Sequence, residues 1–325
     1  MKFDVDDESR LLTESVQRLL ARDYALDARR RIVASDRGAS ASVWASFAEL
    51  GLLGLGIAPD HGGFGGGAKA TMPVMEAFGE ALVVEPYLPT LLASLVISKS
   101  GDEKQKQSIL PLVAEGKIRL ALAMGERGVI GAPMADKVVL VRGKEAVIGK
   151  PTILKSYRTV DGLAAADIRL EQDEPLDGSA IEQVLDFGAA LSCAEAVGAM
   201  KFACDTTLEY LKTRKQFGVP IGAFQALQHR MVDMFIAQEQ ARSMACLACS
   251  KVDSSENAAD RARAVSAAKI KIADSARHIS QESVQLHGGM GMSEELKVSH
   301  TFRRLTVLLR RFGDVDHHLA RFASL

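Results

Sequence analysis

Two glycine-containing segments in the last third of the chain carry residues suited to holding a phosphate and a flat ring. The first, residues 214–221, reads Arg-Lys-Gln-Phe-Gly-Val-Pro-Ile. An arginine can clamp a phosphate and a phenylalanine can stack on a ring, so Arg214 and Phe217 on a rigid turn are candidate nucleotide contacts. The alternative interpretation is a solvated loop between two helices.

The second segment, residues 285–291, reads Gln-Leu-His-Gly-Gly-Met-Gly and ends a long stretch of helical periodicity. Paired glycines leave backbone N–H groups open to a ligand because no Cβ obstructs them, and such amides suit a phosphate. From the residues alone, a helix C-cap followed by a flexible turn is the favoured interpretation.

Residues 63–68 read Gly-Phe-Gly-Gly-Gly-Ala and satisfy the dinucleotide-binding pattern G-x-G-x-x-A. That pattern requires a strand before it, a helix after it and an acidic residue about 20 positions later. Glu85 fits the last requirement loosely, but the turn at residues 59–62 separates the motif from any strand. The sequence therefore argues against a doubly wound nucleotide-binding sheet.

Two further pairs could suggest a metal or redox site, and we expect neither. Cys246 and Cys249 have the C-x-x-C spacing, but they lie in a helical run without a turn and share one helix face as small apolar residues. His317 and His318 are adjacent, so on a helix they point in different directions, and we interpret both as surface residues. The cluster Arg29-Arg30-Arg31 is interpreted as a solvated helix face.

The composition is that of an ordinary globular protein of 325 residues, with 47% hydrophobic residues, 25% charged residues and a formal net charge of −1. This balance gives no electrostatic reason to expect a nucleic acid or an acidic membrane surface as a partner. The acidic start has no apolar segment typical of a secretory signal. The uncharged apolar stretch at residues 50–58 is too short to span a bilayer. We expect a soluble, cytoplasmic protein.

Helical periodicity dominates both ends of the chain and is interrupted in the middle. Helices are expected between residues 7 and 120, and long helices over 181–213, 224–252 and 258–286 predict an up-down bundle. Between residues 120 and 176 the residue pattern is typical of strands, with two strands joined at residues 142–144 and another over 167–171. Residues 173–178 are expected to be a linker.

Taken together, these motifs resemble the acyl-CoA dehydrogenase family over nearly the whole chain. In the N-terminal third the resemblance rests on residues 47–54, 62–65 and 101–107, in the family's order. In the C-terminal third it rests on Tyr210-Leu-Lys-Thr-Arg-Lys-Gln-Phe-Gly218 with Gln225, followed by residues 285–291. Residues 157–162 and 224–230 are most similar to the small subunits of pimeloyl-CoA dehydrogenases, and also to heteromeric enzymes of steroid side-chain breakdown.

The resemblance implies FAD as cofactor, an acyl-CoA thioester as substrate and an assembly in which FAD lies between subunits. Arg214, Phe217 and Gln225 would contact the FAD of a neighbouring subunit. Gln285, Gly288 and Gly289 would meet its pyrophosphate or adenosine part. No metal ion is implied.

One departure from the family concerns the catalytic carboxylate, which removes the α-proton while the β-hydrogen leaves as hydride to the flavin. A well-placed base contributes about 10²–10⁴ in rate. Alignment from Arg304 places Gly313 where relatives carry this glutamate, and the alternative position used in other branches falls on Gly188. Glycine has no titratable group, so both positions lack a base.

The other departure concerns the middle domain, which in relatives is a β-barrel covering the flavin. Eight strands of about 6 residues with turns of about 4 need about 76 residues. Only residues 120–176 are available, so a complete barrel does not fit. The loop that usually lies against the flavin reads Gly125-Glu-Arg-Gly128, and the single tryptophan, Trp44, is in the N-terminal third.

The sequence therefore predicts a mainly α protein with an N-terminal helical domain (1–119), a reduced middle β domain (120–176) and a C-terminal four-helix bundle (177–325). The favoured function is a subunit of a heteromeric flavin-dependent acyl-CoA dehydrogenase that lacks its own catalytic glutamate. One alternative is a self-sufficient homo-oligomer with an unusual base, for which the nearest carboxylates are Asp186, Glu282 and Asp314. Another is a flavin-free scaffold paralogue. A dimer or a tetramer is expected, supported by apolar residues on the bundle helices: Val197, Met200, Phe202, Val232, Met234 and Phe235.

Overall fold

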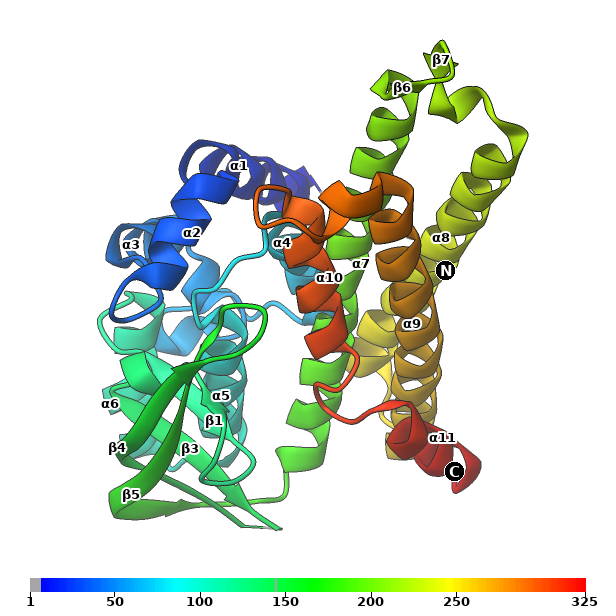
Figure 1. Ribbon diagram of the computed structural model, residues 1–325. Coiled ribbons are helices and arrows are strands. Elements are labelled where there is room, and N and C mark those ends of the chain that lie inside the picture. The colour runs from blue at the N-terminus through cyan, green and yellow to red at the C-terminus, as the bar shows by residue number, and fades with distance from the viewer. Residues whose placement is uncertain (1–6, 144) are drawn as a thin grey trace. The chain divides into compact units, whose positions relative to one another are not determined.

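The computed structural model describes residues 7–143 and 145–325, which form two compact units. The first unit contains residues up to 71 together with residues 83–188, and the second contains residues 72–82 and 189–325. Two helices, α4 (Ala68–Ala81) and α7 (Ile181–Thr213), begin in the first unit and continue in the second (Figure 1).

The helices of the first unit precede its strands in the chain. They are α1 (Asp7–Asp23), α2 (Leu26–Ala34), α3 (Ala41–Glu49), α5 (Tyr87–Ser100) and α6 (Glu103–Ala114), with short 3₁₀ turns η1 (Leu52–Gly54), η2 (Pro59–His61) and η3 (Ala132–Met134). Side-chain caps fix two of these starts: Ser40 accepts from the Val43 N–H, and Asp102 forms a capping box with Gln105. Between residues 7 and 119 the structure contains no strand, so no nucleotide-binding sheet surrounds residues 63–68.

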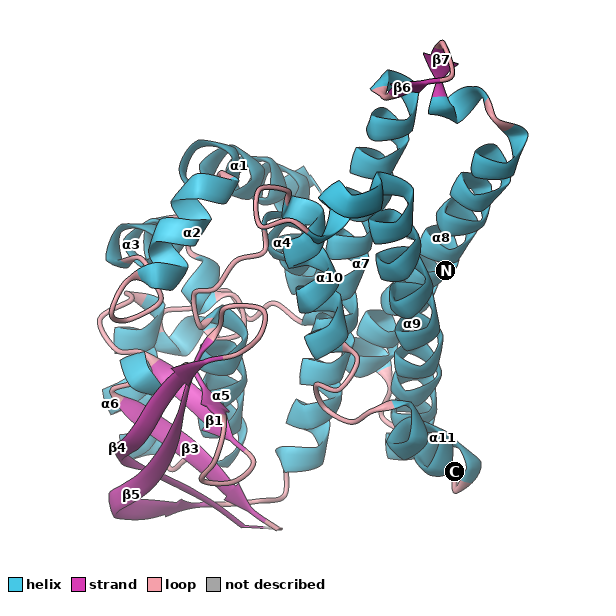
Figure 2. Ribbon diagram, in the orientation of Figure 1, coloured by secondary structure: helices cyan, strands magenta, loops and turns pink. Residues whose placement is uncertain are grey.

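The strands of the first unit form one five-stranded sheet in the order β1-β3-β4-β5-β2 (Figure 2). They are β1 (Leu120–Ala123), β2 (Val129–Ile130), β3 (Lys137–Arg142), β4 (Glu145–Arg158) and β5 (Ala164–Leu176). β1 runs parallel to β3, and the other pairs are antiparallel. Buried alanines and aliphatic residues of the sheet form a small hydrophobic core, which includes Ala121, Val138, Leu140 and Ile168. The expected shortened β segment is confirmed.

The second unit is a bundle of long helices with a small hairpin. After α4 and α7 come β6 (Lys215–Gln216), β7 (Val219–Pro220), η4 (Ile221–Ala223), α8 (Gln225–Ser254), α9 (Ala258–His287), η5 (Gly288–Met292), α10 (Lys297–Leu308) and α11 (Val315–Ala323). The predicted fold class, mainly α with a small β part, is confirmed. The domain boundaries at 119/120 and 176/177 stay a prediction.

Two glycines let α4 and α7 pack with their backbones in direct contact. A Cβ on Gly79 of α4 would overlap the carbonyl oxygen of Glu195 on α7, and a Cβ on Gly198 of α7 would overlap the carbonyl oxygen of Glu76 on α4. The contact is thus reciprocal: each helix offers a glycine to a carbonyl of the other. Any side chain at either position would force the two helices apart.

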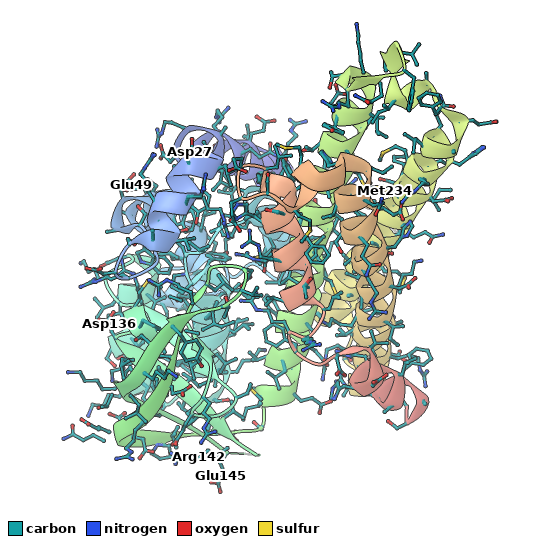
Figure 3. All side chains as sticks on the ribbon, in the orientation of Figure 1. Asp27, Glu49, Asp136, Arg142, Glu145 and Met234 are labelled. Atoms are coloured by element: carbon teal, nitrogen blue, oxygen red, sulfur yellow. The ribbon has the colours of Figure 1, made fainter. Side chains whose placement is uncertain are left out.

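Several local predictions from the sequence were wrong. Residues 173–176 continue β5 instead of forming a linker, and Arg142 at the end of β3 (Figure 3) lies 3.5 Å from Asp173 on that strand. Arg29 is buried rather than solvated, because its guanidinium donates to the Asp161 carbonyl oxygen at 2.6 Å in the β4–β5 turn. The neighbouring Arg30 is exposed, as expected.

The apolar bundle residues divide between core and surface. Val197, Met200 and Met234 (Figure 3) are fully buried in the second unit, so they offer nothing to a partner and that part of the expectation was wrong. On α8, however, Val232 and Phe235 are 54% and 58% exposed, and Ile236 beside them is 47% exposed. These three residues, at positions i, i+3 and i+4, share one helix face.

One described helix, α7, is long and apolar enough to cross a membrane when judged by length and composition. In the structure, 89% of its most apolar window is buried inside the protein. It is a core helix of the bundle.

Candidate functional site

The hairpin after α7 presents Phe217 at its tip. Phe217 and Gly218 have φ values of +54° and +83°, so both central residues of the two-residue turn are left-handed, as a tight hairpin turn requires. Phenylalanine rarely adopts this conformation, which costs about 1–3 kcal/mol and tends to persist at functional positions. Phe217 is 90% exposed, and the ring of Phe224 lies edge-on to its ring at 6.1 Å.

Arg214 connects α7 to this hairpin and is exposed. Its backbone is fixed on both sides: its N–H donates to the Tyr210 carbonyl at 2.8 Å, and its carbonyl accepts from the Ile221 N–H at 2.8 Å. Gln225 is the first residue of α8 and is also exposed. The predicted trio Arg214, Phe217 and Gln225 therefore lies in the connection between α7 and α8, and all three residues are exposed.

The turn after α9 is the second predicted segment. Gln285, Gly288 and Gly289 are exposed, and a Cβ built on either glycine would meet no described atom within 4 Å. Gly288 has a φ of +62°, a backbone conformation that favours glycine. Gly291 instead is packed, because its Cβ would lie 2.5 Å from the Val284 carbonyl oxygen. The backbone of Gly288 and Gly289 is therefore exposed to solvent, whereas Gly291 packs closely against the end of α9.

A stacked pair of rings joins the two segments. The rings of Tyr210, on the last turn of α7, and His287, the last residue of α9, are 4.4 Å apart with an interplanar angle of 26°. His287 is only 3% exposed, and its Nδ1–H donates to the Ser283 carbonyl at 2.7 Å. Burial lowers the pKa of His287, so the ring is neutral near neutral pH. The sequence reasoning missed both residues as site elements.

Gly313, at the position expected to have lost the catalytic glutamate, lies in the connection between α10 and α11. It has a φ of +103°, and a Cβ there would clash with the His317 ring and lie 2.9 Å from His318 Nε2. Phe312 before it also has a positive φ, +57°. This backbone can hold a glycine at 313 but not a glutamate without rearrangement.

Side chains from α9 and α11 hold this connection by its carbonyl groups. Lys269 Nζ donates to the carbonyls of Leu308 at 3.1 Å and Arg311 at 2.7 Å. His318 Nε2–H donates to the Phe312 carbonyl at 3.0 Å, and its Nδ1 lies 3.2 Å from Ser266 Oγ. His318 is buried, so its interpretation as a surface residue was wrong; His317 is exposed, as expected. Burial lowers the pKa of His318 to about 4 and also lowers that of Lys269.

A buried carboxylate from α7 anchors the same region. Glu195 Oε1 lies 2.6 Å from Arg304 Nη1, and Oε2 lies 3.1 Å from Arg311 Nη1. Arg304 is only 1% exposed. The α10–α11 connection is therefore held by an ion-pair network from α7 as well as by the carbonyl bonds. Nothing in the sequence pattern pointed to Glu195.

The alternative base positions are also accounted for. Gly188 is buried within α7, and Asp186, two residues before it on that helix, is also buried. Glu282 is bound to Arg230 at 2.6 Å. Asp314 caps α11 by accepting from the His317 N–H at 3.0 Å. Glu282 and Asp314 therefore have structural partners that a general base would have to give up.

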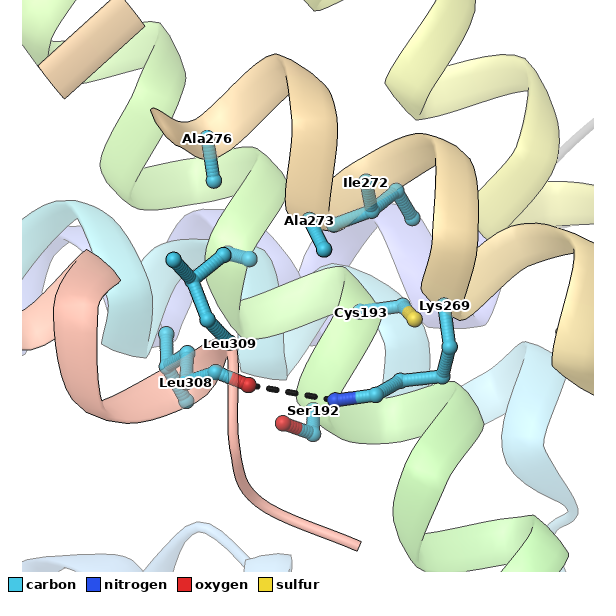
Figure 4. Close-up of a pocket in the computed structure, with 9 residues that line it drawn as sticks. Ser192, Cys193, Lys269, Ile272, Ala273, Ala276, Leu308 and Leu309 are labelled. Atoms are coloured by element: carbon cyan, nitrogen blue, oxygen red, sulfur yellow. Dashed lines mark hydrogen bonds between the residues drawn. The ribbon is translucent and has the colours of Figure 1, made fainter. Parts of the chain in front are cut away.

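The cavity between α7, α9 and the end of α10 is small (Figure 4). Its lining includes Ser192, Cys193, Lys269 and Leu308, and it has room for no more than about one water molecule. Burial raises the pKa of the Cys193 thiol to about 11, so this cysteine is unreactive at neutral pH. This cavity cannot hold an acyl chain or a flavin.

The cysteine pair lies on one helix, as predicted. Cys246 and Cys249 lie within α8; Cys249 is buried and Cys246 is half-buried, and burial raises the pKa of both thiols. Among the described residues, no group of three or more His, Cys, Asp or Glu side chains has an arrangement that could hold a metal ion.

Comparison with known proteins identifies the family. Residues 6–117 match the acyl-CoA dehydrogenase N-terminal domain, and residues 178–319 match the acyl-CoA dehydrogenase C-terminal domain. The chain is 32% identical over 300 residues to acyl-CoA dehydrogenase IpdE2 of Mycobacterium tuberculosis, which covers 92% of this chain and 91% of IpdE2. The chain belongs to the acyl-CoA dehydrogenase family.

Solved structures of the same fold extend over the whole chain, including the sheet. A variant of the Tcur3481–Tcur3483 steroid ACAD superposes with a TM-score of 0.91 at 22% identity, covering 98% of this chain and 97% of the matched chain. The ChsE4–ChsE5 complex from Mycobacterium tuberculosis superposes with a TM-score of 0.90 at 19% identity, covering 100% and 98%. The predicted family, a family of FAD-dependent oxidoreductases, is confirmed.

The acyl-CoA dehydrogenase signatures are thus brought together at one end of the bundle, through Tyr210 and His287. The individual roles of Arg214, Phe217, Gln225, Gln285, Gly288 and Gly289 stay predictions.

Proposed function

We propose that this chain is the non-catalytic subunit of a heteromeric, FAD-dependent acyl-CoA dehydrogenase located in the cytoplasm. In this proposal it contributes Arg214, Phe217 and the 285–289 turn to an FAD held with an unlike subunit. That subunit supplies the carboxylate which removes the α-proton of the acyl-CoA thioester. The bound FAD would accept the β-hydrogen as hydride.

The observation that carries the proposal is the state of the base position. Gly313 has no titratable group, and its φ of +103° and its contacts with His317 and His318 are incompatible with a glutamate. The other position is Gly188; of the three carboxylates nearest in the sequence, Glu282 and Asp314 are engaged in an ion pair and a helix cap. Neither position at which the resemblance places a base therefore carries a titratable group in this chain.

The residues that remain fit a flavin nucleotide. Arg214 offers a charged fork for a pyrophosphate, the open amides of Gly288 and Gly289 suit phosphate oxygens, and Phe217 offers an exposed ring face. These groups point to solvent, as residues that reach toward another subunit must. Among the structural relatives, ChsE4–ChsE5 is a complex of two different proteins, and Tcur3481–Tcur3483 is a steroid ACAD. Both are consistent with an unlike partner.

The exposed apolar face of α8 supports an oligomer. Val232, Phe235 and Ile236 together present a face that the chain by itself leaves in water, and such faces commonly mark subunit interfaces. We propose that this face is covered in a dimer or tetramer. Sedimentation of the isolated chain and of the co-expressed complex measures this, and a monomer in both samples at micromolar concentration contradicts it.

The deciding experiment is co-expression with an acyl-CoA dehydrogenase encoded beside this chain, followed by absorbance and activity measurements. The complex is expected to be yellow and to reduce an artificial acceptor with one or more acyl-CoA thioesters, including steroid-derived ones. The isolated chain is expected to show essentially no turnover, even with added FAD. A yellow, active isolated chain would support a self-sufficient enzyme instead, and a complex that is never yellow would support a flavin-free scaffold.

Arg214 provides the residue-level test in that complex. Arg214→Ala should weaken FAD binding by at least roughly tenfold, because a charge-assisted hydrogen bond contributes about 1.5–3 kcal/mol. Lys212→Ala is the matched control, since Lys212 is an exposed cation on the same helix end that pairs with Glu209 at 2.7 Å. FAD titration by fluorescence measures both. Equal affinity in the Arg214 variant and the wild-type complex would remove Arg214 from the site.

A further inference from the structure

Two aromatic side chains, one from each candidate cofactor-binding segment, meet at one end of the helical bundle. Tyr210 lies four residues before Arg214, and its carbonyl accepts the Arg214 N–H at 2.8 Å. This hydrogen bond fixes the Arg214 backbone relative to Tyr210. Tyr210 is partly buried, so its ring is packed against protein rather than free in solvent.

His287 has the corresponding place in the other segment, directly before Gly288. Its ring is held from one side by the bond from Nδ1–H to the Ser283 carbonyl and from the other by the Tyr210 ring at 4.4 Å. The turn that follows is exposed and has no described atoms within 4 Å of a Cβ built on Gly288 or Gly289. The exposed turn is therefore held in place from the protein side through His287, the residue that precedes it.

From this geometry we infer that Tyr210 and His287 are positioning residues that set the spacing between the Arg214 hairpin and the Gly288–Gly289 turn. The inference rests on the proposed function, because it assigns both segments to one flavin nucleotide. Neither ring needs to touch the cofactor. The stacked pair keeps the cationic fork and the open amides at a fixed separation before the ligand arrives, so less ordering is needed on binding.

The test combines a flavin measurement with a geometric one. In the co-expressed complex, Tyr210→Leu should weaken FAD binding roughly three- to tenfold, the value of an aromatic pair of about 0.5–1.5 kcal/mol. Tyr210→Phe keeps a ring that can stack and should bind FAD as the wild type does. Far-UV circular dichroism and the thermal midpoint of both variants serve as folding controls.

The geometric measurement uses the isolated chain without flavin. Spin labels are attached through Lys215→Cys on the hairpin and Met292→Cys beyond the turn, in a Cys246→Ser background; the other native thiols are buried. Tyr210→Leu should broaden the label-to-label distance distribution, and Tyr210→Phe should leave it unchanged.

The outcomes separate this inference from the proposed function. If the wild-type complex is yellow but Tyr210→Leu changes neither FAD affinity nor the distance distribution, the positioning role is overturned and the function stands. A colourless wild-type complex overturns the proposed function and the flavin role of the pair together. A broadened distance distribution with weakened FAD binding, both restored in Tyr210→Phe, supports the inference.

Discussion

Placing a glutamate at position 313 should fail to create an active enzyme, and it should destabilise the chain. The family resemblance places the catalytic base at this position, so Gly313→Glu supplies the carboxylate that the proposal takes to be missing. In this structure the residue has a φ of +103°, Phe312 before it is also left-handed, and the rings of His317 and His318 occupy the space of a Cβ. The substitution therefore meets both backbone strain and a steric conflict.

The magnitude follows from those two contributions. A non-glycine residue in a sparsely populated backbone region costs about 1–3 kcal/mol. His317 is exposed and can turn away at little cost, but His318 is buried and bonded to Phe312 and Ser266, so it must be displaced. Overpacking of this kind costs about 1–3 kcal/mol. We expect a total loss of about 2–6 kcal/mol, a large part of the 5–15 kcal/mol typical of a folded domain.

Gly143 offers a matched control. It has a φ of +65° in the β3–β4 turn, and a Cβ there would meet nothing within 4 Å. Gly143→Glu introduces the same side chain and charge at a left-handed glycine without the steric conflict. Its cost should be that of the backbone alone, about 1–2 kcal/mol.

Urea denaturation of the two purified variants and the wild type measures the stability difference, and electron transfer from acyl-CoA thioesters to a dye measures activity. Gly313→Glu should denature at clearly lower urea than Gly143→Glu, and neither should oxidise acyl-CoA. Equal stability of the two variants would refute the steric argument. Robust turnover by isolated Gly313→Glu would refute the conclusion that this position cannot accept a base.

Two further predictions concern stability. Gly198→Ala should destabilise the protein by about 3 kcal/mol or more, because its Cβ would overlap a backbone carbonyl of α4 that cannot move independently. The loss is measured as a lower urea midpoint, with the surface variant Lys215→Ala as control. An unchanged midpoint would show that α4 and α7 are not tightly packed where they cross. His318 should make the fold sensitive to acid: its folded pKa of about 4 lies below the ordinary value of 6.5, so stability is complete above about pH 6.5 and is lost, by up to about 3 kcal/mol, as pH falls toward 4. His318→Gln should flatten this part of the pH dependence and His317→Gln should not, and the reverse pattern would contradict the assignment.

The sequence was sufficient to predict the elements whose periodicity is long and regular. The helices over 181–213, 224–252 and 258–286 appear in the structure within one or two residues, because amphipathic repeats over eight turns leave few alternatives. The glycine-rich turns were also located correctly. Glycine at 288 and 218 is required locally by a positive φ, and a local requirement is visible in a local sequence.

Contacts between distant residues could not be read from the pattern. Arg29 sits in a run of three arginines, yet it is buried because the Asp161 carbonyl from the β4–β5 turn accepts its hydrogen bond. His318 is buried because its partners come from α9 and the α10–α11 connection. Such burial depends on which elements become neighbours, and a single sequence gives only the composition of each element.

The exposed hairpin of the candidate site and the buried α10–α11 connection both support the proposed non-catalytic subunit. Phe217 is held in a strained conformation with 90% of its side chain in water, an arrangement that the stability of this chain alone does not explain. Gly313, in contrast, lies in a connection that Lys269, His318 and Glu195 hold in place, at the position where the family resemblance leads us to expect the base. A self-sufficient homo-oligomer would use the exposed hairpin on a neighbouring copy and would also need a base at or near position 313. A subunit that completes another chain's flavin site needs only the hairpin and can fill position 313 with structural bonds, which is the combination that we propose for this molecule.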